Sequence, residues 1–203
     1  MILVFAKEPA PGTVKTRLAQ RIGPERAAEL AVAFLRDTWE LVASMPGLSP
    51  VLVLDGATPF PAEVWPQGDG DLGARMELAL RRGIEAAGFA IAIGTDLPGL
   101  PAARLRQAAD ALQSGRAASV LGPAEDGGFY LIGLSRCPPG ALSGLPWSTP
   151  STCEATEARL TELGMPPLRL EQWFDVDEAK DLERVRQHGG AHARAVLAGW
   201  ERR

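Results

Sequence analysis

The segment Phe89-Ala-Ile-Ala-Ile-Gly-Thr-Asp-Leu-Pro-Gly-Leu-Pro101 constrains the fold more than any other part of the chain. Its first half is a short, almost wholly apolar run, which is typical of a strand buried on both faces of a parallel sheet. Pro98 and Pro101 prevent the strand from continuing and favour the start of a helix. Alternating strands and helices of this kind predict an α/β fold.

Thr95 and Asp96 are the first polar side chains after this apolar run. Open α/β sheets bind their ligands beyond the carboxyl ends of the parallel strands. We therefore expect Asp96 at the mouth of a binding site. The alternative is that Asp96 only caps the helix that begins near Pro101, although it lies too far from that helix to be a good cap.

The composition excludes several classes of protein. A chain of 203 residues, 46% of them apolar, can bury a substantial core, and we expect one domain over residues 1–203. No apolar run approaches the roughly 18–20 residues of a membrane span, and no signal peptide is evident. A net charge of −4 argues against nucleic acid as the main partner. We expect a cytoplasmic protein without a membrane partner; the oligomeric state, including a homodimer, stays open.

The apolar run Ile2–Ala6 predicts a second central strand, followed by a loop from Lys7 to Arg17 and a short helical segment. Lys7, Lys15 and Arg17 gather three cations in an otherwise acidic chain. Backbone N–H groups of such a loop, with cations nearby, suit a phosphate or pyrophosphate. The alternative is a solvated basic loop without a ligand.

A long helix is expected from Pro24, and a strand over Val51–Leu54. The prolines of residues 59–66 then predict an extended loop without regular structure. The segment Gln67–Met76 joins this loop to a helix, and Asp69 or Asp71 is a candidate for its N-cap. Its three glycines equally allow a ligand to approach the backbone, which leaves both interpretations open.

A second candidate binding loop, Gly122–Gly128, lies between two predicted strands. Glu125 and Asp126 would be costly if they were buried and unpaired, so we place them at the mouth of a site. The neighbouring Gly127 and Gly128 would let a substrate approach the backbone. The alternative is a hairpin turn with a solvated Asp-Gly pair.

The last third of the chain adds an aromatic residue and two acids. Trp147 lies in the Pro- and Gly-rich stretch Cys137–Pro150, which is a candidate flap or acceptor-side loop. Asp177 is expected to be the N-cap of the helix that follows it. Asp175 lies two residues earlier on the same face of an extended segment, where it is free to reach a cation.

The ordered set of motifs resembles the bacterial DUF2064 proteins, some of which are assigned as glycosyltransferases of arsenosugar biosynthesis. The resemblance spans nearly the whole chain and rests on six segments: Phe5-Ala-Lys-Glu-Pro-Ala-Pro-Gly-Thr-Val-Lys-Thr-Arg-Leu18, Gly70-Asp-Leu-Gly-Ala-Arg-Met76, Gly94-Thr-Asp-Leu-Pro98, Gly122-Pro-Ala-Glu-Asp-Gly-Gly-Phe-Tyr130, Pro146-Trp147-Ser148 and Asp175-Val-Asp177.

The wider relatives are nucleotide-diphospho-sugar transferases of the GT-A type, together with molybdenum-cofactor and phospholactate guanylyltransferases. The resemblance implies a three-layer α/β/α sandwich with a mainly parallel, Rossmann-type sheet. It also implies a Mg²⁺ or Mn²⁺ ion at Asp96 with Asp175 and Asp177. The nucleotide-binding residues that we expect are Ala6, Lys7, Gly12, Lys15, Thr16, Arg17, Gly70, Asp71, Thr95 and Asp96.

Together with these residues, the resemblance implies a metal-dependent transferase that uses a nucleotide or nucleotide-sugar and a small-molecule acceptor. The metal at Asp96 would neutralise charge on the departing pyrophosphate, and Lys15 would supplement it. Asp126 is the candidate for hydroxyl recognition or general base catalysis. The expected substrate-binding residues are Glu125, Asp126, Gly127, Gly128 and Trp147.

Three functions are carried forward: glycosyl transfer from a nucleotide-sugar, nucleotidyl transfer from a nucleoside triphosphate to a small phosphorylated substrate, and non-catalytic nucleotide binding or a scaffold role. Two departures from the relatives bear on the choice. The loop after the first strand has one glycine where nucleotidyltransferases usually have Gly-x-Gly-x-Arg, and the Asp-x-Asp motif of glycosyltransferases is reduced to Thr95-Asp96.

Overall fold

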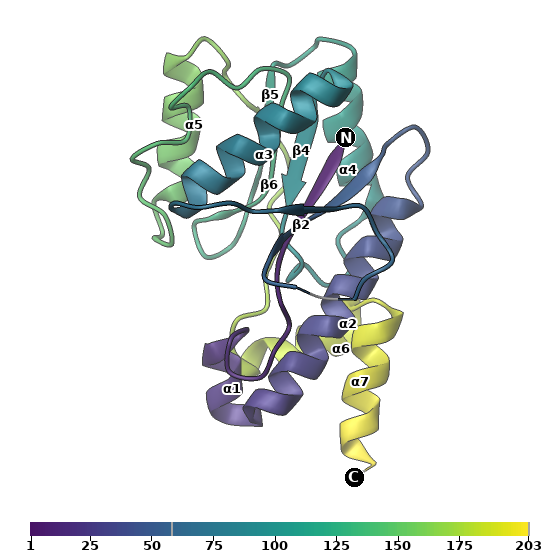
Figure 1. Cartoon of the computed structure of the whole chain (residues 1–203). Coiled ribbons are helices and arrows are strands. Elements are labelled where there is room, and N and C mark those ends of the chain that lie inside the picture. The colour runs from purple at the N-terminus through teal and green to yellow at the C-terminus, as the bar shows by residue number, and fades with distance from the viewer. Residues whose placement is uncertain (58, 203) are drawn as a thin grey trace.

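The computed structural model describes residues 1–57 and 59–202, and these residues form one seven-stranded sheet in the order β3-β2-β1-β4-β6-β5-β7 (Figure 1). The strands are β1 (Ile2–Lys7), β2 (Pro50–Asp55), β3 (Val64–Pro66), β4 (Ala90–Ile93), β5 (Ser119–Pro123), β6 (Phe129–Leu134) and β7 (Leu168–Arg169). Strand β6 runs antiparallel to both of its neighbours, whereas every other pair is parallel. The expectation of a mainly parallel sheet is confirmed.

The helices cover both faces of this sheet, which confirms the three-layer arrangement. Helices α2 and α4 pack on one core, and α3 and α5 pack on the other. A further apolar cluster joins α1, α2, α6 and α7 in the lower part of Figure 1. The bounds are α1 (Thr16–Ile22), α2 (Pro24–Ala43), α3 (Leu72–Ala87), α4 (Ala102–Gln113), α5 (Thr152–Glu162), α6 (Leu182–His188) and α7 (Ala191–Glu201), with a 3₁₀ turn at Ala179–Asp181.

The central strands show why continuous apolar runs predicted them. In β1, Leu3 and Val4 are both fully buried, yet Leu3 packs in the α3 and α5 core and Val4 in the α2 and α4 core. Successive side chains of a strand point to opposite faces, so a strand covered on both sides must be apolar throughout.

The prediction that residues 59–66 lack regular structure is wrong at their end. Val64–Pro66 forms β3 and pairs in parallel with β2. It is the edge strand of the sheet, and a proline is tolerated there because one side of the strand needs no donor for a ladder hydrogen bond.

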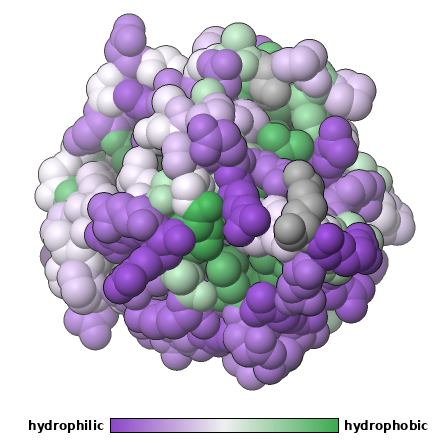
Figure 2. Space-filling model, turned by 90° about the horizontal axis from the view of Figure 1, so that it is seen from below, coloured by the Kyte–Doolittle hydropathy of each residue, from purple (hydrophilic) through white to green (hydrophobic). Residues whose placement is uncertain are grey.

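In the part of the chain that the structure describes, no helix combines the length and the apolar character that a membrane crossing requires. Seen from below Figure 1, the surface is largely hydrophilic, and a few hydrophobic side chains gather near the middle of that face (Figure 2).

Candidate functional site

The candidate site lies at the edge of the sheet where β1, β4 and β5 end. The chain leaves β7 and crosses this edge, held by backbone hydrogen bonds from Trp173 to Pro123 (3.0 Å) and from Val176 to Asp96 (3.2 Å). This crossing carries Asp175 and Asp177 to the end of β4. Residues that the sequence separates by about 80 positions thus meet where open α/β sheets bind ligands.

Lys15 is the central cation of the site. Its ammonium Nζ lies 2.8 Å from Oδ2 of Asp96 and donates a 2.6 Å hydrogen bond to the carbonyl of Val176. Oδ1 of Asp177 lies 3.5 Å away. Only 12% of the Lys15 side chain is exposed, and its backbone has a left-handed conformation (φ 47°) at the start of α1, so the turn directs the ammonium inward.

Burial and neighbouring charges shift the pKa values of Lys15 and Asp96 in opposite directions. Burial alone would lower the pKa of Lys15, but the carboxylates of Asp96, Asp177 and Asp175 outweigh it and raise that pKa. Burial would raise the pKa of Asp96, but the charge and hydrogen bond of Lys15 lower it. Both groups are therefore held in their charged forms.

Asp175 is partly buried and lies near three other carboxylates. Burial, followed by the charges of Asp126, Asp96 and Asp177, raises its pKa to about 6. Among the described residues, the cations that pair with these carboxylates are Lys15 and, 3.6 Å from Asp177, the largely exposed Arg17; the charge of Arg184 also acts on Asp175. A divalent cation would add positive charge to this acidic group.

The prediction that Asp177 caps the following helix is wrong. Glu178 is the N-cap of the 3₁₀ turn and forms a capping box with Asp181. Oδ2 of Asp181 accepts the N–H groups of Asp177 (3.0 Å) and Glu178 (2.8 Å). The side chain of Asp177 is therefore left to face Lys15 and Arg17, which places it in the site.

Two adjoining cavities open at this edge. The larger, of about 770 Å³, is bounded by the loop after β1 and includes Lys7, Lys15 and Arg17. The smaller, of about 310 Å³, is bounded by Tyr130, Trp147 and Asp175. Both are lined by Asp96, Asp126 and Asp177, so these carboxylates stand at their junction.

Most of the predicted site residues line one of these cavities. Ala6, Lys7, Lys15, Thr16, Arg17 and Thr95 line the larger one, Gly128, Trp147 and Asp175 the smaller one, and Asp96, Asp126 and Asp177 both. Gly12, Gly70, Asp71, Glu125 and Gly127 line neither of them.

Local structure explains why Asp71, Glu125 and Gly127 lie outside the two cavities. Asp71 is the N-cap of α3, because its Oδ1 accepts the N–H of Ala74 (2.8 Å). Glu125 is exposed and forms a bidentate pair with Arg184 (2.6 and 2.8 Å). A Cβ atom on Gly127 would overlap with the backbone of Pro150, so this glycine serves a close approach of two chain segments.

The sequence interpretation missed other residues that line the cavities. Gln67 is buried, and its side-chain amide donates to the carbonyls of Ala6 (2.9 Å) and Val53 (3.2 Å), which clamps the ends of β1 and β2. No local pattern indicates that role. Ser148 lines both cavities with a left-handed backbone (φ 60°); its position beside Trp147 was the available signal.

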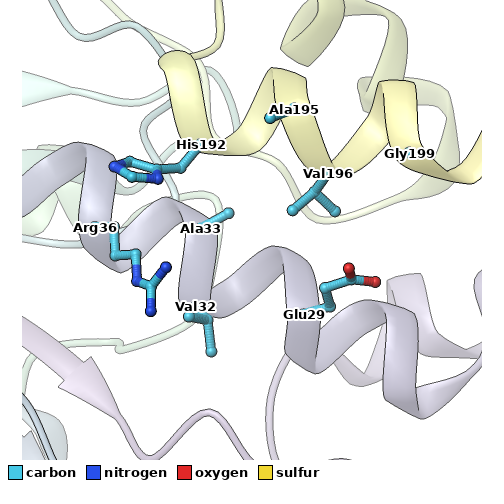
Figure 3. A pocket seen from close by; sticks show the side chains of 8 residues that line it. All are labelled: Glu29, Val32, Ala33, Arg36, His192, Ala195, Val196 and Gly199. Atoms are coloured by element: carbon cyan, nitrogen blue, oxygen red, sulfur yellow. The ribbon is translucent and has the colours of Figure 1, made fainter.

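A further hollow of about 460 Å³ is lined by residues of α2 and α7, among them Ala33 of α2 and His192 and Val196 of α7 (Figure 3). The described residues that line it all belong to these two helices, and none belongs to a strand. Nearby, His192, Glu40 and Asp37 come close enough to share an ion. Both oxygens of Asp37, however, already accept backbone N–H groups at the start of α7.

The residues at the cavity junction fit Mg²⁺ or Mn²⁺, which prefer carboxylate oxygens. Asp96, Asp175 and Asp177 supply such oxygens, and burial together with the neighbouring carboxylates raises the pKa of Asp175. The three do not offer oxygens within 4.8 Å of one another among the described residues. Lys15 occupies part of the space between Asp96 and Asp177.

The sheet order and the site at its carboxyl edge define a protein with the nucleotide-diphospho-sugar transferase fold. The chain belongs to the bacterial family DUF2064, described as "Uncharacterized protein conserved in bacteria", whose model matches residues 30–149. This confirms the resemblance seen in the sequence. No curated protein matches the chain.

Solved structures extend the comparison to the rest of the chain. A "putative nucleotide-diphospho-sugar transferase" from Desulfovibrio desulfuricans G20 is 27% identical with a TM-score of 0.84, over 98% of this chain and 93% of that one. A 2-C-methyl-D-erythritol 4-phosphate cytidylyltransferase from Thermus thermophilus is 18% identical with a TM-score of 0.55, over 95% and 98%. A CMP:2-keto-3-deoxy-manno-octonic acid synthetase complexed with CTP is 15% identical with a TM-score of 0.56, over 92% and 96%. The last two share the fold.

Proposed function

We propose that this protein is a metal-dependent transferase that uses a nucleotide-activated donor, and that the reaction is glycosyl transfer from a nucleotide-sugar. The observation that carries the proposal is the junction of the two cavities at Asp96, Asp126 and Asp177. Cations line one side of this junction, and aromatic and acidic side chains line the other. The similarity to a transferase of this name from Desulfovibrio desulfuricans supports the assignment.

The larger cavity is the proposed nucleotide site. Its volume of about 770 Å³ is within the usual range of ligand pockets. Lys7, Lys15 and Arg17 line it, and their charges suit the phosphate groups of a donor. Gln67 holds the ends of β1 and β2 together and so keeps the floor of this cavity in place.

Asp96 is the proposed metal ligand, with Asp175 or Asp177 as the second. A bound Mg²⁺ or Mn²⁺ ion supplies charge neutralisation at a departing diphosphate. Lys15 holds Asp96 and Asp177 when no ion binds them. In the loaded site its ammonium is free to donate hydrogen bonds to the diphosphate instead.

Asp126 is the proposed general base. It lines both cavities, so its carboxylate lies where an acceptor hydroxyl would meet the donor. Asp126 would remove the proton of that hydroxyl while the acceptor oxygen bonds to the anomeric carbon. The bond from that carbon to the diphosphate breaks, and the nucleoside diphosphate leaves.

Nucleotidyl transfer is the second candidate, and the three cations of the β1 loop favour it. A nucleoside triphosphate carries more negative charge than a nucleotide-sugar and would use all three. The product distinguishes the two reactions, because nucleotidyl transfer releases pyrophosphate and glycosyl transfer releases a nucleoside diphosphate.

A thermal-shift panel tests whether the site binds nucleotides at all. Nucleoside mono-, di- and triphosphates and nucleotide-sugars are compared with Mg²⁺, with Mn²⁺ and with a chelator. A ligand at 100 times its dissociation constant adds about 2.7 kcal/mol, which raises the melting temperature of a domain of this size by several degrees. A metal-dependent shift that Asp96→Ala removes supports the proposal. No shift with any ligand contradicts it and favours the scaffold role.

A further inference from the structure

We propose that the smaller cavity selects a hydroxyl-bearing group that is neutral or cationic, and that it rejects carboxylates and phosphates. The group is the sugar of the donor or the acceptor, so the inference rests on the proposed function and names its substrate class. The observation behind it is the juxtaposition of Asp126 and Asp175 with an aromatic wall that carries no cation.

The charge of the cavity has one sign. Asp96, Asp126, Asp175 and Asp177 all line it. Among the described residues that line it there is no lysine, arginine or histidine. The nearest cation, Lys15, lines the larger cavity and contacts Asp96 and Asp177 from that side, and Arg184 is paired with Glu125.

A divalent ion would not reverse this sign. Such an ion would use Asp96 with Asp175 or Asp177, which leaves Asp126 as a free carboxylate. Oδ1 of Asp126 accepts the N–H of Gly128 at 2.8 Å, and no ion pair engages this carboxylate in the described part of the chain. An anionic group beside Asp126 would therefore meet a carboxylate that forms no ion pair of its own among the described residues.

The walls suit a small polyhydroxylated ring. Phe129 and Trp147 line the cavity and contact each other edge to face, with ring centroids 6.0 Å apart. Apolar walls of this kind cover the C–H face of a sugar, while carboxylates accept hydrogen bonds from its hydroxyls. The volume of about 310 Å³ matches one such ring rather than a long chain.

The donor arm of the test compares three ligands with the same base, which is the one whose nucleoside diphosphate raises the melting temperature in the panel. They are the nucleoside diphosphate, its neutral hexose derivative and the corresponding uronic acid derivative. Calorimetry with Mg²⁺ is expected to show the uronic acid derivative binding at least about tenfold more weakly than the neutral one.

Two variants of adjacent residues control this measurement. Asp126→Asn keeps the acceptor for the N–H of Gly128 but removes the charge, and it is expected to reduce the preference for the neutral sugar several-fold. Glu125→Gln removes the charge of the acid beside it, which lies outside both cavities, and it is expected to leave the preference unchanged. A structural disturbance of the loop would change this preference in both variants.

The acceptor arm compares how tightly matched acceptors bind in the presence of the neutral donor. The pairs are glucose with glucose 6-phosphate, and glycerol with glycerol 3-phosphate. A preference for the neutral ligand in the donor arm assigns the cavity to the donor sugar, and a preference for the neutral acceptor assigns it to the acceptor. Either preference supports the inference. A protein that binds the nucleoside diphosphate but shows no charge preference in either arm overturns it. Nucleotide binding that is absent altogether instead removes the proposed function.

Discussion

The ammonium of Lys15 lies 2.8 Å from a carboxylate oxygen of Asp96, although the two residues are 81 positions apart. Lys15 ends the loop after β1, and Asp96 follows β4, which pairs with β1 in parallel. A divalent ion that binds Asp96 must therefore displace Lys15 or share the carboxylate with it. This contact makes the site sensitive to substitutions on either side of it.

Lys15→Met is expected to lower the free energy of unfolding by about 1–3 kcal/mol when no divalent ion is present. The substitution leaves a partly buried Asp96 without its counter-charge, but 36% of the Asp96 side chain is exposed, which limits the loss. Urea denaturation measures it. The exposed Lys7 is the control, because Lys7→Met should change stability by less than about 0.5 kcal/mol. Equal losses in the two variants would contradict the prediction.

Asp96→Asn is expected to weaken Mn²⁺ binding in the presence of nucleotide at least tenfold, since it removes a charged ligand (roughly 1.4 kcal/mol per factor of ten). The signal of free Mn²⁺ in electron paramagnetic resonance measures this. Glu40→Gln is the control, because Glu40 lies with Asp37 and His192 in a separate group of possible metal ligands. If Glu40→Gln weakens nucleotide-dependent binding and Asp96→Asn does not, the metal site has been misplaced.

Asp175→Asn is expected to make the metal-free protein more stable at about pH 7.5 and to have no such effect at about pH 4. The pKa of Asp175 is raised to about 6 in the folded protein, so the folded state binds this proton more tightly than the unfolded state. Its contribution to stability is present at low pH and is lost as the pH rises through 6. After allowance for its partial exposure, the gain is about 1 kcal/mol. Parallel pH profiles of stability for the two proteins would refute this.

Gly73→Ala is expected to lower the melting temperature, although alanine favours helices more than glycine does. A Cβ atom there would lie 2.5 Å from the carbonyl oxygen of Leu142 and 2.6 Å from Nε1 of Trp147, so α3 or the loop that carries Trp147 must move. Overpacking of this kind costs about 1–3 kcal/mol.

Gly199 in α7 is the matched control for Gly73. A Cβ atom there would meet nothing within 4 Å, so Gly199→Ala should raise stability by roughly 0.5–1 kcal/mol. Differential scanning calorimetry compares the two variants. A gain in stability for both would show that the contact between α3 and the Trp147 loop is loose.

The fold was largely predictable, because its strands and helices follow from local patterns. The run at residues 89–93 became β4, and Pro24 begins the long helix α2 as expected. Asp71 was correctly named as a candidate cap of α3. The error at residues 59–66 occurred where the sheet decided the local structure, because Val64–Pro66 is a strand only through its pairing with β2.

The candidate site was likewise predictable only in part. The positions of Lys15, Asp96 and Asp126 after apolar runs made them candidates from the sequence alone. Glu125 carries the same charge as Asp126 in the same loop, yet it turns outward to Arg184. Asp177 was assigned to a cap that Glu178 forms instead. Neighbouring acids have the same local signal; the long-range contact with Arg184 separates Glu125 from Asp126, and the capping box with Asp181 separates Glu178 from Asp177.

The sequence by itself determined which segments are buried strands and which residues follow them, because hydrophobic periodicity and proline positions act over a few residues. Only the tertiary structure decided that the chain after β7 crosses the carboxyl edge and sets Asp175 and Asp177 beside Asp96. It alone placed Lys15 between two carboxylates and Gln67 across two strands. The physical reason is that charge pairing and burial depend on distances in space, which the packing of the whole sheet sets.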